Sequence, residues 1–231
     1  MQNALEANVF VPPLNTTTTR RISKRSRTSV RSFLTIQVPA DGGRARRVEL
    51  ESKGEADCLF LTLASGNVFD VREQAGPVTY QSWDGAWHSH TFDLLFTLID
   101  GTKIAKAVKP FERVIATSFD RELALIARAA VPSFCDKVVL FTDRDYAPAA
   151  AKDARRLYYA SLQSDPEADA VLAHLCTNLY GRVQIRALAA QAADVGGRLF
   201  GAILRAIYSG QLRHLSIGQV SPLSFVGRSA T

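Results

Sequence analysis

The pattern of apolar and polar positions divides the chain into strand-like and helical segments. Residues 32 to 39 alternate between apolar and polar, which predicts a half-buried strand before a turn at 41 to 44. Residues 50 to 63 carry apolar side chains at intervals typical of a helix, with Ser52 as the candidate N-cap. The chain is therefore expected to begin its folded part with a strand, a turn and a helix.

Strand-like runs in close succession then lead to an α/β fold. They cover residues 68 to 74, 77 to 83, 88 to 99 and 103 to 110, with Asp-Gly pairs at 84–85 and 100–101 as hairpin signals between neighbouring runs. Helical patterns at 119 to 134 and 149 to 162 enclose a buried-looking strand at 137 to 143. This order predicts an α/β/α sandwich with a mixed sheet over residues 32 to 163.

The pattern of apolar residues changes over residues 164 to 231, where short helical segments dominate. Helices are predicted at 184 to 194 and 196 to 212, and Gly210 and a short apolar strand follow. Two short helices separated by a turn and followed by a strand are the layout of a winged helix-turn-helix. An ordinary helical subdomain fits the same pattern.

Charge is unevenly distributed along the 231 residues. Of 28 basic and 22 acidic residues, nine and three lie in residues 1 to 50, so the remaining chain holds 19 of each and the whole net charge of +6 arises at the start. Residues 1 to 20, with a run of four threonines, have no helical period and predict a flexible or partner-bound arm.

A basic cluster completes this arm, which we take as residues 1 to 31. Its members are Arg20, Arg21, Lys24, Arg25, Arg27 and Arg31. Cations at this density can neutralise phosphates and release counterions, which indicates a nucleic-acid partner, although a solvated tail has the same composition.

Composition limits the classes of protein that remain. An apolar content of 47% is ample for a core, and three scattered cysteines form neither a disulfide framework nor a zinc-binding pattern. No apolar run reaches the ~18 residues of a membrane span, and the N-terminal residues lack the pattern of a signal peptide. We therefore expect a soluble, cytoplasmic protein.

Candidate chemistry centres on Asp93, which stands in an otherwise apolar strand. Lys109 lies near the end of the next strand, and pairing across Asp100-Gly101 brings the two together. A buried carboxylate must be paired or bound to metal, and Glu55 of the preceding helix can supply a second one. Two carboxylates holding Mg²⁺ beside a lysine would form a phosphodiester-cleaving site. A structural Asp-Lys ion pair is the alternative.

These residues occur in an order that resembles a known family. The strings VRSF, ESKGE, DCLFLTLA, NVFDVREQ, HTFDLLF and DGTKIAKAVKP look like the "ES..E", "v..i.EQP", "y.PDf.v" and "EVKP" strings of the TnsA-type transposon endonucleases. These belong to the PD-(D/E)XK restriction-endonuclease-like superfamily. KVVLFTD resembles their last core strand, and the segment from 201 to 227 resembles their winged-helix half. The resemblance covers about residues 28 to 228 and rests on order and spacing.

The resemblance implies a fold, a site and partners. The fold would be a restriction-endonuclease-like α/β/α sandwich followed by a small winged-helix-like domain. Glu55, Asp93 and Lys109 would be catalytic, with Mg²⁺, or Mn²⁺ in its place, held by the carboxylates and by main-chain oxygen near Val108. Gln74 and Ser52 would support this site. The protein would nick the 5′ side of transposon ends in the nucleoid of a bacterial cell, with a DDE-type transposase and an AAA+ ATPase.

The chain departs from the family at two positions. Phe92 replaces a proline that is not a ligand, whereas Ala107 stands where the family carries Glu or Gln. A methyl group cannot bind Mg²⁺, so we expect Glu112 or Glu51 to replace the missing ligand. Otherwise the chain is a DNA-binding assembly factor with weak or no cleavage.

Further residues have open roles. His88 and His90 share one strand face and are expected at the polar rim of the site. Trp83 and Trp87 bracket a hairpin tip, where packing across the hairpin competes with stacking on bases or on a protein. The winged-helix-like segment carries four arginines that could contact DNA or a protein: Arg186, Arg198, Arg205 and Arg213. A winged-helix DNA-binding regulator is therefore a further hypothesis.

Overall fold

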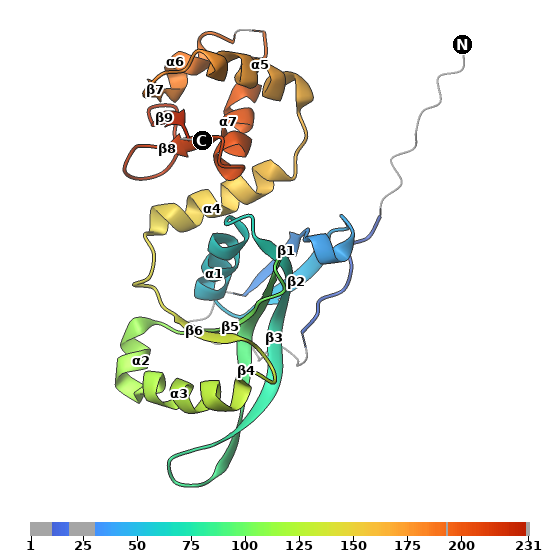
Figure 1. Ribbon diagram of the computed structural model, residues 1–231, viewed down its shortest axis with the longest axis vertical. Helices are drawn as coiled ribbons and strands as arrows, with labels where there is room; N and C mark the ends of the chain where they lie inside the picture. The colour runs from blue at the N-terminus through green and yellow to red at the C-terminus, as the bar shows by residue number, and fades with distance from the viewer. Residues whose placement is uncertain (1–10, 19–30, 193, 230–231) are drawn as a thin grey trace, which may run out of the picture.

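A mixed four-stranded sheet forms the centre of the protein, whose computed structural model describes residues 11–18, 31–192 and 194–229 (Figure 1). Its strands are β3 (Val68–Gln81), β4 (Trp87–Leu98), β5 (Lys103–Val108) and β6 (Lys137–Phe141), in that order. The first three run antiparallel through the two expected hairpins, and β6 joins parallel to β5. The α/β class with a mixed sheet is thus confirmed.

Helices cover both faces of this sheet. On one face, α1 (Lys53–Leu63) packs with Leu94 and Phe96 of β4. On the other, α2 (Phe111–Thr117) and α3 (Phe119–Ala130) contribute to a second apolar cluster that includes Ala105 and Ala107 of β5. The alternation of side chains along β4 and β5 therefore supplies two cores, one on each side.

The strand β3 differs from its predicted form, because the two expected runs are one continuous strand. Its pairing with β4 shifts between Ala75 and Val78, on either side of Gly76. Gly76 has φ +141°, and a Cβ there would lie 3.1 Å from the carbonyl oxygen of His90. A glycine is needed because the irregularity brings two backbones close together.

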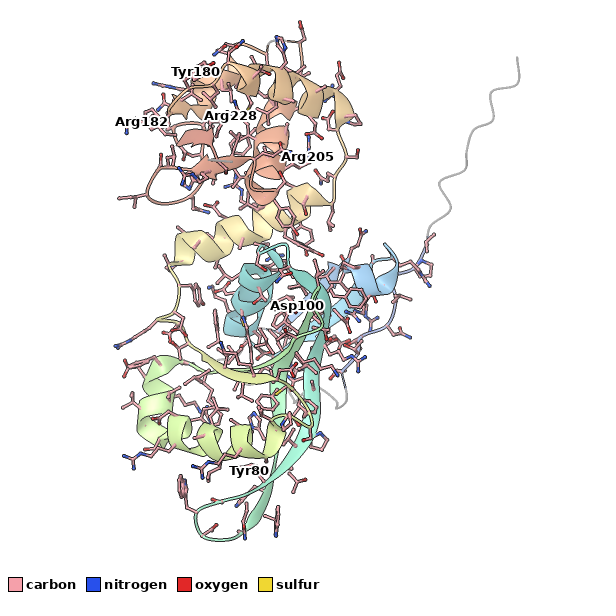
Figure 2. The ribbon with its side chains drawn as sticks, viewed as in Figure 1. Tyr80, Asp100, Tyr180, Arg182, Arg205 and Arg228 are labelled. Carbon is pink, nitrogen blue, oxygen red and sulfur yellow. The ribbon has the colours of Figure 1, made fainter. Side chains whose placement is uncertain are left out.

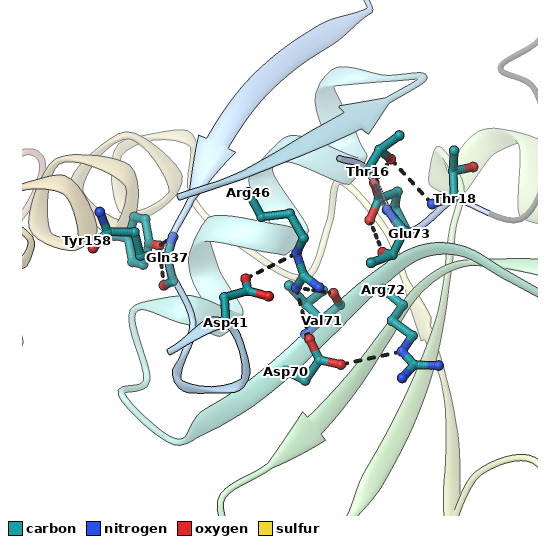
Figure 3. Close-up of polar contacts among 11 residues, drawn as sticks. Thr16, Thr18, Gln37, Asp41, Arg46, Asp70, Val71, Arg72, Glu73 and Tyr158 are labelled. Carbon is teal, nitrogen blue, oxygen red and sulfur yellow. Dashed lines mark hydrogen bonds and ion pairs between the residues drawn. The ribbon is translucent and has the colours of Figure 1, made fainter. Parts of the chain in front are cut away.

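A separate two-stranded sheet precedes α1. It pairs β1 (Ser32–Ile36) with β2 (Arg46–Leu50), joined through the 3-10 turn η1 (Pro39–Asp41). Buried Arg46 holds this sheet to β3: its guanidinium lies 3.3 Å from Asp41 and donates to Asp70 at 2.9 Å and to the carbonyl of Val71 at 2.7 Å (Figure 3). The strand β2 was not predicted; its residues were assigned to the approach to the helix.

The C-terminal part has its own apolar core and small sheet. Its elements are α5 (Pro166–Thr177), β7 (Val183–Gln184), α6 (Ile185–Ala189), α7 (Arg198–Tyr208), β8 (Leu212–His214) and β9 (Phe225–Arg228), and its strand order is β7-β9-β8. The helix α4 (Pro148–Ser161) joins it to the sheet domain and contacts both α1 and α7. Within the described ranges, no helix has both the length and the apolar character needed to cross a membrane.

Candidate active site

Glu55 occupies the first turn of α1 and is 4% exposed. Ser52 caps this helix: its hydroxyl accepts from the Glu55 amide at 3.1 Å and donates to Glu55 Oε1 at 2.8 Å. The Glu51 amide donates to Oε2 at 2.8 Å. This pattern is similar to a capping box, except that the backbone donor to Glu55 is the amide of Glu51, one residue before the N-cap. Ser52 and Glu55 hold each other in place as the helix begins. The predicted N-cap is confirmed.

The environment of Glu55 favours its protonated form. Burial, and then the nearby negative charges of Asp93 and Glu51, raise the pKa of Glu55 to about 7, against the lowering effect of its hydrogen bonds to the Glu51 amide and the Ser52 hydroxyl. Asp93 and Glu51 thus place negative charge near a buried carboxylate, which disfavours its ionised form. A bound cation would relieve both the desolvation and the repulsion.

Asp93 lies on β4 beside the end of β5. Its carboxylate accepts a 2.7 Å hydrogen bond from the amide of Val108, the last residue of β5. The first turn of α1 reaches the same place, because a Cβ on Gly54 would lie 3.2 Å from Val108 Cγ1. Glu55, Asp93 and Val108, which the sequence predicted as metal ligands, therefore converge at one end of the sheet.

Lys109 continues the chain from this point, and its amide donates to Phe141 of β6 at 3.0 Å. Its ammonium group lies 4.3 Å from the centre of the Phe119 ring, which belongs to the α3 face of the sheet. Burial, and then the charge of Lys109, lower the pKa of His90 to about 4, so this imidazole is neutral at pH 7. Lys109 thus extends the site toward α3, where His90 and Phe92 contact each other edge to face.

Gln74 is fully buried on β3, at the position opposite Asp93. It has φ +50°, a left-handed conformation that is rare outside glycine and costs about 1–3 kcal/mol. The strain lies immediately before the irregularity at Gly76. The place of Gln74 on β3, opposite Asp93, is compatible with the supporting role that was predicted for it.

Glu73 is a fully buried carboxylate that the sequence did not single out. Hydroxyl groups of Thr16 and Thr17 donate to it, the latter at 2.6 Å, and the Thr17 amide donates at 3.2 Å (Figure 3). The threonine run, which was predicted as part of a flexible or partner-bound arm, here contacts the body of its own chain. The threonine run was the one feature of the sequence that could have indicated this contact. No local pattern connects the run to Glu73, which lies more than 50 residues away.

The replacement ligands expected for Ala107 differ in their positions. Glu112 has an 80% exposed side chain and pairs with Arg144 at 2.7 Å. Glu51 lies closer to the centre, since its charge acts on Glu55. Ala107 itself is fully buried in the apolar cluster under α3. Of the two candidates, Glu51 is the one that the fold brings to Glu55.

Hard oxygen ligands are the donor set that suits Mg²⁺. Glu55 and Asp93 provide two carboxylates, and among the described residues no three His, Cys, Asp or Glu side chains gather closely enough to enclose a metal ion. Mg²⁺ keeps several waters and commonly binds one or two carboxylates together with substrate phosphates. The residues present fit such an open site.

The residues predicted to bind nucleic acid fall mostly outside the described ranges. This applies to Arg20, Arg21, Lys24, Arg25 and Arg27, whereas Arg31 is half-buried and immediately precedes β1. In the C-terminal part, Arg198 pairs with Asp165 and Glu167. Arg205, labelled in Figure 2, pairs with Asp169 at 2.7 Å.

Two arginines of α7 are therefore engaged within the protein. Arg213 is exposed, and the exposed Arg186 donates to Gln184 at 2.6 Å. Comparison with known proteins adds no assignment, because neither a protein-family model nor a curated protein matches this sequence.

Proposed function

We propose that the protein is a metal-dependent DNA endonuclease. The observation that carries this proposal is the convergence of Glu55, Asp93 and Val108 at one end of a mixed sheet, where burial and the like charge of Asp93 raise the pKa of Glu55. Perturbed carboxylates at a strand end are typical of catalytic centres. The most basic segment of the chain precedes this site in the sequence.

Each residue has a defined task in this mechanism. Glu55 and Asp93 would hold Mg²⁺; the Ser52 hydroxyl and the Glu51 amide fix the direction of the Glu55 carboxylate, and the Val108 amide fixes that of Asp93. Mg²⁺ bound there would supply Lewis-acid chemistry, which polarises a phosphate and lowers the pKa of a bound water. Lys109 contributes positive charge at the same strand end, which offsets the charge that develops on the phosphate.

The particular assignment is a subunit of a heteromeric transposase, similar to the TnsA-type endonucleases. The restriction-endonuclease-like sandwich is supported by the two-sided helical cover of the mixed sheet. A winged helix is supported by the element order α5-β7-α6-α7-β8-β9 and the strand order β7-β9-β8. The substrate would be transposon-end DNA, cut on the 5′ side together with a DDE-type transposase and an AAA+ ATPase.

Two observations bear on the competing functions. The burial of Ala107 in an apolar cluster favours an assembly factor with the nuclease fold but without cleavage. The regulator hypothesis is disfavoured, because the helix that would read DNA in a winged helix, α7, buries Leu199, Ile203 and Leu204 and packs against α4 and α5. We therefore retain the assembly factor as the second candidate.

Nicking of supercoiled plasmid tests the proposal. Wild-type protein should nick with Mg²⁺ or Mn²⁺, with the partner transposase present, and Asp93→Asn should abolish nicking while the protein remains folded. Glu112→Gln is the matched control, since that carboxylate is exposed and paired with Arg144. If the wild type and Asp93→Asn nick equally, the assigned site is wrong. If neither nicks but both bind transposon-end DNA, the protein is the assembly factor.

A further inference from the structure

The two tryptophans of the protein both lie at the tip of the β3–β4 hairpin, which extends past the rest of the sheet (Figure 1). Trp83 is 72% and Trp87 is 71% exposed. Packing across the hairpin, one of the readings open from the sequence, would have buried them against each other or against a neighbour. Exposing two indoles leaves a large apolar area in water, and such surfaces mark contact sites.

The hairpin tip is held in shape by its own hydrogen bonds. The Gly85 amide donates to the Ser82 carbonyl at 3.0 Å, and the Ser82 amide donates to the Ala86 carbonyl at 2.9 Å. The side chain of Asp84 accepts from the Ala86 amide at 3.0 Å. The tryptophans are thus presented on a pre-organised turn, which lowers the entropy lost when they bind something.

The two indoles occupy different environments. Trp83 lines a cavity of about 860 Å³ between the hairpin and the α2–α3 junction, together with Ser82, Thr117, Ser118, Arg121, Glu122 and Ala124. Trp87 follows on β4 and does not line it. His88, its neighbour, contacts Tyr80 of the α3 face. Alternation along the strand therefore directs Trp87 to the opposite face of the ribbon.

The chemistry of this cavity suits a nucleobase. One wall is an aromatic ring on which a base can stack, and the exposed Arg121 and the hydroxyls of Ser118 and Thr117 can bond to a base edge or a phosphate. Glu122, the one acid in the lining, already accepts a hydrogen bond from Tyr80. The core of a protein–protein interface is mostly apolar, whereas this cavity offers one aromatic ring among polar groups. The cavity is therefore poorly suited to an apolar protein segment.

The position of the tip relates it to the candidate active site. Six residue-to-residue steps along β4 lead from Trp87 to Asp93, a span of about 20 Å at ~3.3 Å per step. A DNA strand advances ~3.4 Å per nucleotide, so the tip would meet a strand about six nucleotides from the scissile phosphate. We propose, on the basis of the nuclease function above, that the Trp83 cavity binds an unpaired base of the DNA substrate by stacking.

Tryptophan fluorescence tests this directly, because each Trp→Phe variant of the full chain leaves a single reporter. Trp87→Phe reports on Trp83 alone, and Trp83→Phe reports on Trp87 alone. With EDTA present to prevent cleavage, an oligo(dT) single strand should quench Trp83 saturably and quench Trp87 much less. A fluorescein-labelled blunt duplex should bind, as measured by anisotropy, with little quenching of Trp83.

Affinity measurements with alanine variants complete the test. Trp83→Ala should weaken oligo(dT) binding about 5- to 150-fold, whereas the equally exposed Trp87→Ala, the matched control, should leave it close to wild type. Trp83→Phe, which keeps a stacking ring, should recover most of the loss. Equal losses for the two alanine variants, or no quenching of Trp83, would overturn the proposal.

Two further outcomes identify the alternative. If no DNA quenches Trp83 but its emission shifts to the blue as protein concentration rises, the tip is a protein contact and the base-binding proposal is wrong. Failure of the nuclease assignment is separately visible: nicking would be absent while quenching by oligo(dT) remains.

Discussion

Glu55→Gln should stabilise the protein at alkaline pH, although it removes a charge from a helix cap. The folded protein holds the proton of Glu55 more tightly than the unfolded chain does, with a pKa of about 7 against 4.5. Protons are therefore released on unfolding between these values, and the free energy of unfolding falls as pH rises through that window. Below about pH 4.5 the contribution is fully favourable; above about pH 7 it is lost.

The magnitude follows from the size of the shift. A difference of about 2.5 pKa units corresponds to about 3 kcal/mol at 1.36 kcal/mol per unit. Glutamine keeps the shape and one acceptor oxygen for the Ser52 hydroxyl or the Glu51 amide, but carries no charge at any pH. We expect the variant to match the wild type near pH 4 and to exceed its free energy of unfolding by up to about 3 kcal/mol near pH 8.

Urea unfolding across this pH range, monitored by circular dichroism, measures the difference. Glu112→Gln is the control, because its 80% exposed side chain predicts a change of only about 0–1 kcal/mol. Adding Mg²⁺ then separates a metal ligand from a simple helix cap. At a hundred times its dissociation constant, Mg²⁺ should add ~2.7 kcal/mol to the wild type at pH 8 and nothing to Glu55→Gln.

Two results would refute this reasoning. A wild-type-minus-variant difference that stays constant between pH 4 and pH 8 would show that Glu55 has an ordinary pKa. Equal stabilisation of both proteins by Mg²⁺ would show that Glu55 is not a ligand, and Glu55 would then be a capping residue only.

Three other substitutions test the surrounding structure. Arg46→Ala should lower the free energy of unfolding, measured by urea denaturation, by about 3–5 kcal/mol. It removes the guanidinium that pairs with two partly buried carboxylates, Asp41 and Asp70. Ala107→Glu should not restore a ligand but destabilise the protein by at least ~2 kcal/mol, because the position is enclosed in an apolar cluster; a rise in nicking rate would contradict this. Thr17→Val removes a hydrogen bond to the buried carboxylate of Glu73 and should cost about 1.5–3 kcal/mol, seen as a lower Tm, whereas an unchanged Tm would mean that this contact does not stabilise the fold.

Local signals in the sequence predicted the elements that hold the site. The two Asp-Gly turns fixed the order of β3, β4 and β5, and with it the approach of Asp93 to the end of β5. Ser52, the predicted N-cap, placed Glu55 in the first turn of a helix. A helix was also predicted at 119 to 134. The helix α3 ends earlier, at Ala130 and shortly before Pro132, because proline disfavours a helical conformation in the residue before it.

Long-range contacts account for what the sequence did not reveal. The strand β2 contains Arg46, Arg47 and Glu49, and its strand character depends on pairing with β1 and on buried partners for Arg46. Glu73 is likewise explained only by the threonines that reach it from the N-terminal segment. Such positions are decided by tertiary packing, for which a local hydrophobic pattern holds no information.

The helix α4 gives the molecule a fixed internal spacing. Ala154 and Tyr158 belong to the core against α1, whereas Ala160 belongs to the C-terminal core, and Arg156 bonds to the Val220 carbonyl at 2.9 Å. Both cores therefore meet this 14-residue helix within the short span from Ala154 to Ala160, on different sides of it. One helix is thus shared by two cores, so whatever binds the C-terminal sheet is held at a fixed position relative to the end of β5.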